Sequence, residues 1–268
     1  MYKKGDRFQY QSVVDRYRFR PDYPDEIYDQ LRSFVDNDSI VLDIGCGPGK
    51  LSYHMAPHVK RIDGVDLSTA MIEAAKADQR DDTNINWFVG DIHTTQLDSS
   101  YDLMMAGASI HWMNWDSLFL ILGPLQSSRG NVVFLEGDGA VNHAWGYDEL
   151  EVLKTLQLDI NEERPEWVDR VSFPAKAKES LVTHPLFTRE GFVAVIHRTN
   201  KSIHDYIEIN FSRQSCALDC MNLVRADRFR NDMRELLAPH AKDGMLSYDV
   251  SVICEWGRLE RFPHRSEQ

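Results

Sequence analysis

Three glycines at alternate positions follow a run of apolar residues. Gly45, Gly47 and Gly49 lie within VLDIGCGPGKLS, residues 41–52. A glycine-rich turn after a strand lets a ligand approach the backbone and is typical of nucleotide-binding sites. The dinucleotide fingerprint is G-x-G-x-x-G, whereas the spacing here is G-x-G-x-G with Pro48 inside the turn. The turn therefore predicts a nucleotide-derived ligand, and its spacing disfavours a pyrophosphate.

Three carboxylates are expected at the ends of three successive strands. Asp43 precedes the first glycine by two positions, Asp66 follows Gly45 by 21 residues, and Asp91 ends a third apolar run. Open α/β sheets bind ligands at such strand ends. Asp43 would favour a cation nearby, and Asp66 could accept hydrogen bonds from two ribose hydroxyls. The acids predict a cationic nucleoside without phosphate; the alternative is a packing turn with acids that cap helices.

The elements that must position these residues alternate between strands and helices from about 39 to 138. Expected strands are 39–45, 61–68, 85–91, 101–109 and 131–138, and expected helices are 24–36, 50–57 and 69–78, the last capped by Ser68 or Thr69. After 140 a polar helical stretch, a strand at 191–199, a helical segment at 203–224 and a strand at 246–259 follow. The pattern predicts an α/β fold with a Rossmann-like, doubly wound, seven-stranded and mostly parallel sheet.

Composition restricts the partners of the chain. It has 268 residues, with 42 acidic against 30 basic side chains and a net charge of −12. That charge disfavours a nucleic acid as partner. Four cysteines, no apolar leader and no apolar stretch of membrane-spanning length predict a cytoplasmic protein away from the membrane. Cys216 and Cys220 lack further nearby ligands, so no metal site is expected.

Four segments resemble the successive motifs of class I S-adenosylmethionine-dependent methyltransferases: VLDIGCGPGKLS, GVDLSTAMIEAA, FVGDI and YDLMMAGASIHWMNWD. The resemblance is closer to the type 11, trans-aconitate-like branch, whose members often have Tyr-Arg-Pro-x-Tyr-Pro before the first strand and His-Trp after the fourth. This chain has YRFRPDYP at 17–24 and the pair His111–Trp112. The resemblance implies S-adenosyl-L-methionine as cofactor, S-adenosyl-L-homocysteine as product and a small-molecule acceptor.

The same resemblance implies roles for individual residues. The three glycines would let the backbone approach the cofactor, Asp43 would lie near its amino group, and Asp66 would bind the ribose. Leu67 and Met71 would flank the adenine, Asp91 and Ile92 would contact its edge and face, and Ala106 would lie near the methionine portion. Further expected cofactor contacts are Tyr17, Arg20, Cys46, Gly90, Gly107 and His111. Two residues separate Tyr17 from Arg20, so which arginine takes the family's role stays open.

Methyl transfer from a sulfonium is an in-line displacement, so positioning matters most and a base is needed only for a protonated nucleophile. Candidate catalytic residues are His111, Glu136 and His143. Each has a plain alternative: His111 could position the backbone, Glu136 could cap a helix or pair with an arginine, and His143 could belong to the folded core of the insertion.

The acceptor side is described only by residue type. Trp112, Trp145 and Tyr147 could line a pocket for an apolar acceptor, or form the core of the insertion. Arg16, Arg18 and Arg20 could pair with a carboxylate on the acceptor, or balance an acidic surface. Oligomeric state is open.

We expect one methyltransferase domain over 1–268, with an N-terminal helical cap at 1–38, a cofactor-binding half at 39–140, a helical lid insertion at 141–187 and a substrate-side half at 188–268. Two other functions remain open at this point. One is a protein of the same fold that uses the cofactor structurally or for a non-methylating reaction. The other is an NAD(P)-dependent oxidoreductase, which the glycine spacing disfavours.

Overall fold

Two units of structure alternate along the chain. The computed structural model describes residues 6–78, 84–97, 100–137, 139–160, 184–213 and 216–260. The first unit, here called the sheet unit, comprises Tyr23–Gly137, Pro174–Val195 and Val252–Gln268. The second, the helical unit, comprises Met1–Asp22, Asp138–Phe173 and Ile196–Ser251. The assignment of 1–38 as a cap and 141–187 as a lid within one domain stays a prediction, and 161–183 lies outside the described residues.

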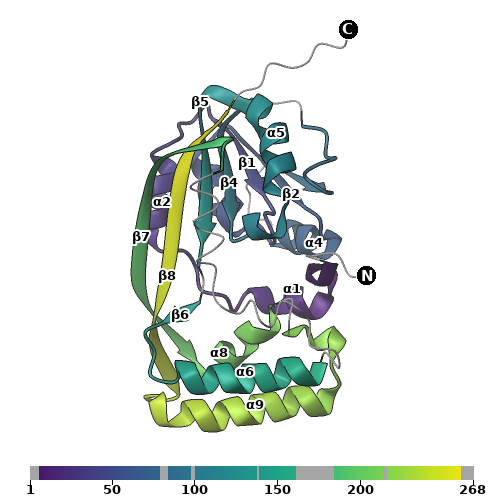
Figure 1. Cartoon of the computed structure of the whole chain (residues 1–268), viewed down its shortest axis with the longest axis vertical. Helices are drawn as coiled ribbons and strands as arrows, with labels where there is room; N and C mark the ends of the chain where they lie inside the picture. The colour runs from purple at the N-terminus through teal and green to yellow at the C-terminus, as the bar shows by residue number, and fades with distance from the viewer. Residues whose placement is uncertain are drawn as a thin grey trace. The chain divides into compact units, whose positions relative to one another are not determined.

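The described strands form one sheet in the order β3-β2-β1-β4-β5-β8-β6, with β7 paired to β8. The strands are β1 Ile40–Ile44, β2 Arg61–Asp66, β3 Ile85–Val89, β4 Tyr101–Gly107, β5 Gln126–Glu136, β6 Ala140–Val141, β7 Phe187–Ser202 and β8 Met245–Leu259. β1 to β5 pair in parallel, whereas β8 is antiparallel to β5 and β6 (Figure 1). The α/β, mostly parallel sheet expected from the sequence is thus confirmed.

The parallel part of the sheet is built as expected for a doubly wound fold. Its helices are α2 Asp25–Arg32, α3 Lys50–Met55, α4 Thr69–Ala77 and α5 Trp115–Leu125, with the short turns η2 Ala56–His58 and η3 Ile110–Trp112. Strand order reverses between β1 and β4, so right-handed crossovers place α3 and α4 on one face and α5 on the other. The residues that follow β1 and β4 therefore meet at the point where such sheets bind ligands.

Apolar side chains on the strands and on α5 form the core of the sheet unit. Leu42, Met104, Phe119, Phe134 and Phe187 are all buried in one cluster. β1 to β4 follow the expected runs closely, because each run is bounded by glycine or polar residues, whereas β5 begins at Gln126, five residues before the expected strand 131–138. At α4 the Ser68 hydroxyl accepts the backbone N–H of Met71 at 3.2 Å, which confirms one of the two expected caps.

The described sheet has eight strands, one more than the seven expected. The extra strand is β6, in which Ala140 and Val141 pair with Val250 and Asp249. Two residues carry no periodicity that a sequence could reveal, so β6 exists only through its pairing with β8. β7 and β8 are both longer than predicted.

The helical unit contains most of the remaining helices: η1 Asp6–Gln9, α1 Gln11–Tyr17, α6 Gly146–Ile160, α8 Ile203–Phe211, η6 Leu218–Cys220, α9 Leu223–Leu237 and η7 Ala238–His240. The expected helical segment 203–224 is therefore not one helix. α8 ends at Phe211 with Ser212 as its C-cap, and α9 begins at Leu223, where the Asn222 side chain accepts the backbone N–H of Arg225 at 2.9 Å. Each cap forms hydrogen bonds with the backbone groups at a helix end that have no partner within the helix, so the segment contains two helices instead of one.

One buried carboxylate joins three helices of this unit. Glu208 on α8 accepts hydrogen bonds from Arg16 on α1 at 2.8 Å and from Arg230 on α9 at 2.7 Å. Both arginines hold the pKa of Glu208 below its usual value although burial opposes this. Pairing on both sides compensates for burying the charge.

Candidate functional site

The turn after β1 has the backbone that its glycines predict. Gly45, Gly47 and Gly49 have φ of 65°, 54° and 83°, a left-handed region that disfavours other residues. A side chain at position 45 would lie 2.6 Å from Ser109 Cβ, and one at position 49 would lie 2.5 Å from Trp87 Cη2. Two of the three glycines are therefore required by protein packing as well as by backbone conformation.

Hydrogen bonds tie this turn to the neighbouring strands. The backbone N–H groups of Gly45 and Cys46 both donate to the carbonyl oxygen of Val65, at 2.8 and 3.1 Å. The Ser109 hydroxyl, which follows β4, donates to the Ile44 carbonyl oxygen at 2.5 Å. The ends of β1, β2 and β4 are thus held together, and Cys46 itself is buried.

Asp66, at the end of β2, links the turn to the start of α4. Its Oδ2 accepts the Gly47 N–H at 2.8 Å, and its Oδ1 accepts the Ser68 N–H at 2.8 Å. Burial raises the pKa of Asp66, and the two backbone donors oppose that shift. The carboxylate has the place at a strand end that the sequence predicted for ribose binding, and each oxygen retains a second lone pair.

Asp43 lies beneath the turn instead of at its surface. Its side chain is 1% exposed, and its Oδ2 accepts the Ser52 hydroxyl at 2.6 Å. Burial raises its pKa to about 7, the Ser52 hydrogen bond opposes this, and the nearby charge of Asp66 adds to it. Asp43 can act on a ligand above the turn through its field or through neighbouring groups, which fits the indirect contact predicted for it.

The residues expected around an adenine differ in exposure. Leu67 is 46% exposed, whereas Met71 and Ile92 are buried in the core. After β3, the Gly90 N–H donates to the Asp66 carbonyl oxygen at 2.9 Å, and Asp91 accepts the backbone N–H of His93 at 3.0 Å. Leu67 thus presents an apolar surface beside Asp66, while Met71 and Ile92 are part of the buried core.

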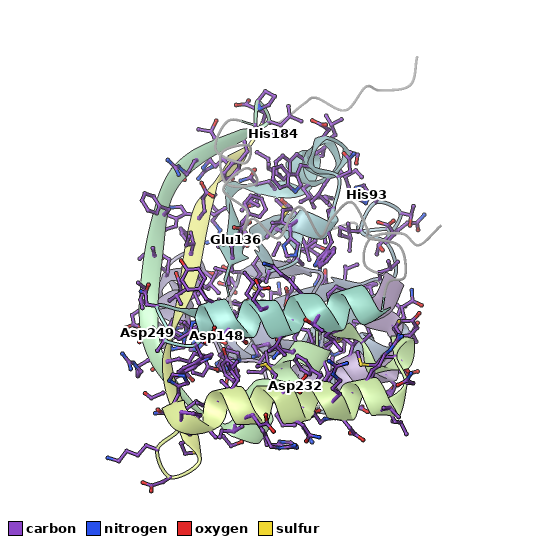
Figure 2. All side chains as sticks on the ribbon, turned by 60° about the horizontal axis from the view of Figure 1, so that its bottom comes forward. His93, Glu136, Asp148, His184, Asp232 and Asp249 are labelled. Atoms are coloured by element: carbon purple, nitrogen blue, oxygen red, sulfur yellow. The ribbon has the colours of Figure 1, made fainter. Side chains whose placement is uncertain are left out.

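The segment after β4 contains the expected methionine-side and catalytic residues. Ala106 is buried, and a side chain at Gly107 would lie 2.5 Å from Leu51 Cδ1 and 3.0 Å from the Tyr23 hydroxyl. His111 is exposed on η3, with its ring centroid 4.7 Å from that of Trp112. Glu136, which Figure 2 labels, ends β5 and is half-buried. Asp138, which follows it, lies outside the described residues.

The other expected site residues belong to the helical unit. Arg20 donates to the Ser212 hydroxyl and carbonyl oxygens, both at 2.9 Å, and its guanidinium stacks over the Tyr17 ring at 4.5 Å. Arg16 is bound to Glu208, and Arg18 is exposed. These contacts give two of the three clustered arginines a role inside their own unit.

His143 and Trp145 are part of a hydrogen-bonded core in the same unit. His143 Nε2 lies 3.0 Å from Glu149 Oε2, the Tyr206 hydroxyl donates to Glu149 at 2.8 Å, and Trp145 Nε1 donates to Tyr206 at 3.1 Å. Burial, together with the charge of Glu149, raises the pKa of Tyr206. Tyr147, in contrast, is 89% exposed. This geometry supports the plain alternative for His143 and Trp145, a folded core.

Four residues near the turn were not expected from the sequence. The Ser52 hydroxyl donates to Asp43, and the Ser109 hydroxyl donates to the carbonyl oxygen of Ile44 on β1. The Tyr23 hydroxyl lies near Gly107. Ala108 has a φ of 54°, which is unusual for alanine. Tyr23 lies within the quoted segment 17–24, which was the one available signal. Among the described residues no cluster of three or more His, Cys, Asp or Glu side chains could hold a metal ion, and no helix is long and apolar enough to cross a membrane.

Comparison with known proteins agrees with this geometry. Residues 41–123 match the family model described as a methyltransferase domain. CRG1 of Saccharomyces cerevisiae, assigned as an S-adenosylmethionine-dependent methyltransferase, is 29% identical over 121 residues, which cover 43% of this chain and 42% of CRG1. Trans-aconitate 2-methyltransferase of Escherichia coli is 34% identical over 99 residues, which cover 36% of this chain and 38% of that enzyme. The chain thus spans less than half the length of the curated relatives it matches.

Similarity to solved structures extends over more of the chain. A protein from Anaeromyxobacter dehalogenans, assigned as a type II methyltransferase, superposes with a TM-score of 0.65 at 16% identity, covering 91% of this chain and 99% of that one. At this identity the likeness shows the fold. The family match shows that residues 41–123 are similar to a methyltransferase domain, and the strand order and the glycine turn with Asp66 agree with that similarity.

Proposed function

We propose that this protein transfers the methyl group of S-adenosyl-L-methionine to a small-molecule acceptor. The observation that carries the proposal is the turn Gly45–Gly49 bound to Asp66 at the reversal of strand order, within a segment that matches the methyltransferase domain. Open α/β sheets bind nucleosides at this place.

Asp66 fits a ribose. Each carboxylate oxygen already accepts one backbone N–H, so each has one lone pair for a ribose hydroxyl. Leu67 follows it directly, and Val89 lies opposite it on β3; both are exposed apolar side chains. An adenine ring could cover this apolar surface while the ribose binds Asp66.

The charges of the site fit a cationic ligand. Asp43 and Asp66 lie at adjacent strand ends, and each raises the cost of placing negative charge nearby. When bound, S-adenosyl-L-methionine would supply a methyl group on a positively charged sulfur. The acceptor nucleophile would attack the methyl carbon in line with the carbon–sulfur bond, which breaks and releases neutral S-adenosyl-L-homocysteine. The task of the chain is to hold both partners in that line and to exclude water.

His111 and Glu136 are the proposed groups on the acceptor side of the sheet unit. Both follow strands whose C-terminal ends lie at the same edge as the turn. We propose that His111 either takes a proton from the acceptor or orients it, two roles that kinetics separates. Loss of a base lowers kcat with little change in the cofactor dissociation constant, whereas loss of a structural contact changes both.

For the acceptor we propose a small molecule that carries a carboxylate. The support is the similarity to trans-aconitate 2-methyltransferase. The net charge of −12 and the low number of cysteines, four in 268 residues, favour a cytoplasmic protein that does not act on nucleic acid.

Two assays test the proposal: one measures release of S-adenosyl-L-homocysteine from S-adenosyl-L-methionine, and the other measures binding of S-adenosyl-L-homocysteine. Release of S-adenosyl-L-homocysteine is measured with a panel of di- and tricarboxylic acids and with the corresponding amides as controls. A protein that binds S-adenosyl-L-homocysteine but releases none from S-adenosyl-L-methionine with any acceptor would support the alternative of a structural or non-methylating use. The comparisons supply no support for an oxidoreductase, and NADH serves as the control ligand.

A further inference from the structure

The strand β7 has an edge that no other described strand covers. In the described part of the chain, β7 Phe187–Ser202 pairs with β8 alone, and Figure 1 shows it as the outermost strand on that side. A strand of sixteen residues with one uncovered edge offers a long row of backbone donors and acceptors. Such an edge is a template for pairing with another strand.

The middle of β7 is apolar on both faces. Phe192 and Ile196 are 59% and 60% exposed on one face, with Ala194 between them. Val193 and Val195 lie half-buried on the opposite face. A strand that merely bordered solvent would have polar side chains at the three exposed positions, so this stretch is suited to being covered.

Charged residues flank the apolar stretch symmetrically. Glu190 lies two residues before Phe192, and Arg198 lies two residues after Ile196. Both point to the exposed face and form ion pairs with β8, Glu190 with Arg258 at 3.0 Å and Arg198 with Asp249 at 2.7 Å. All four side chains retain exposure to solvent, so a second partner could join each pair.

This face is self-complementary about Ala194. In an antiparallel pair of two β7 strands with a two-fold axis at Ala194, Phe192 of each copy faces Ile196 of the other, and Glu190 of each faces Arg198 of the other. Ala194 is also close to the middle of Phe187–Ser202, so nearly the whole strand takes part. Directly opposite residues on one face of such a pair contact each other, and apolar and opposite-charge pairs both stabilise it.

We propose that the protein forms a symmetric homodimer in which the two β7 strands pair antiparallel about Ala194. In each copy the arrangement pairs the β7 edge that no described strand covers, and it brings the exposed apolar side chains of the two copies side by side. Because the same patch is used twice, the assembly closes at two chains. This proposal is independent of the methyltransferase activity.

The first test is sedimentation velocity over a range of protein concentrations. We expect a reversible dimer, and we expect Ile196→Lys to weaken it by about tenfold or more, because two lysines would be placed against two phenylalanines in the dimer. Leu223→Lys is the matched control: it makes the same kind of change at an exposed position on α9 and should leave the dimer unchanged. A chain that stays monomeric at all concentrations, or a dimer that survives Ile196→Lys, overturns the proposal.

Charge reversal tests the register without changing the apolar stretch. Glu190→Arg alone and Arg198→Glu alone each place like charges opposite each other twice, so each variant should be mainly monomeric. Mixing the two variants restores opposite charges at both positions of a heterodimer, which should form with an affinity near that of the unmodified chain. If the mixture dimerises no better than either variant alone, the two-fold register about Ala194 is wrong.

Discussion

Replacing Asp43 by asparagine should change how the stability of the protein depends on pH. Burial raises the pKa of Asp43 from 3.8 to about 7 in the folded protein. The folded chain therefore holds a proton that the unfolded chain has lost between these two pH values. The stability that this group contributes is fully present below about pH 3.8 and is lost as pH rises through about 7. Each pH unit in that window corresponds to about 1.4 kcal/mol.

Asparagine cannot titrate. The difference in free energy of unfolding between Asp43→Asn and the unmodified chain therefore isolates the contribution of the Asp43 proton. Asp43→Asn should gain about 3 kcal/mol in free energy of unfolding relative to the unmodified chain between pH 5 and pH 7, because these two pH units lie between the unfolded and folded pKa values of Asp43. The assay is urea denaturation without cofactor at several pH values from 5 to 8. Asp36→Asn is the control, since Arg129 holds the pKa of Asp36 at about 2 and its charge does not change in this range.

Parallel stability curves for Asp43→Asn and the unmodified chain across pH 5 to 8 would refute the reasoning. A stability difference between Asp43→Asn and the unmodified chain that falls with rising pH would also refute it, since that sign requires a lowered pKa.

The same proton links stability to function. If a cationic cofactor binds above Asp43, it favours the charged carboxylate, and calorimetry in buffers of different ionisation enthalpy near pH 7 should detect proton release on binding.

Three further substitutions test the site. Asp66→Ala should weaken binding of S-adenosyl-L-homocysteine by at least about tenfold, yet hardly change binding of an analogue without ribose hydroxyls; equal losses for both ligands would contradict the ribose role. His111→Ala should lower kcat more than it weakens cofactor binding, and equal loss of both in turnover and calorimetric assays would favour a positioning role. Gly49→Ala should cost about 1–3 kcal/mol in urea denaturation, because φ is 83° and Trp87 lies where the methyl group would go, whereas Gly139→Ala meets nothing within 4 Å and should be nearly neutral.

The sequence predicted the parallel part of the sheet well for a physical reason. β1 and β4 are buried at most of their positions, so each appears as a short apolar run with glycine or polar residues at its ends. β6 could not be predicted, because its two residues are a strand only through pairing with β8. α9 was missed although Ala226, Phe229, Met233 and Leu237 have helical spacing, since many arginines and acids mask that pattern.

Site residues divide in the same way. The positions of Asp66 and of the glycines follow from local spacing, and the structure places them together at the strand ends. The Ser52 hydroxyl on Asp43 depends on how α3 packs over β1, and the bond from Arg16 to Glu208 joins residues 192 positions apart. Contacts of this kind leave no periodic signal in the sequence. For the same reason the contact of His143 with Glu149 was not predicted, and His143 was a catalytic candidate.

The central claim is that the turn at Gly45–Gly49 binds S-adenosyl-L-methionine. Isothermal titration calorimetry of the unmodified chain with S-adenosyl-L-homocysteine tests it most directly, with NADH titrated into the same preparation for comparison. The account predicts saturable binding of one S-adenosyl-L-homocysteine per chain and no saturable binding of NADH. Absence of binding of S-adenosyl-L-homocysteine at millimolar concentration, or saturable binding of NADH in its place, would contradict the account.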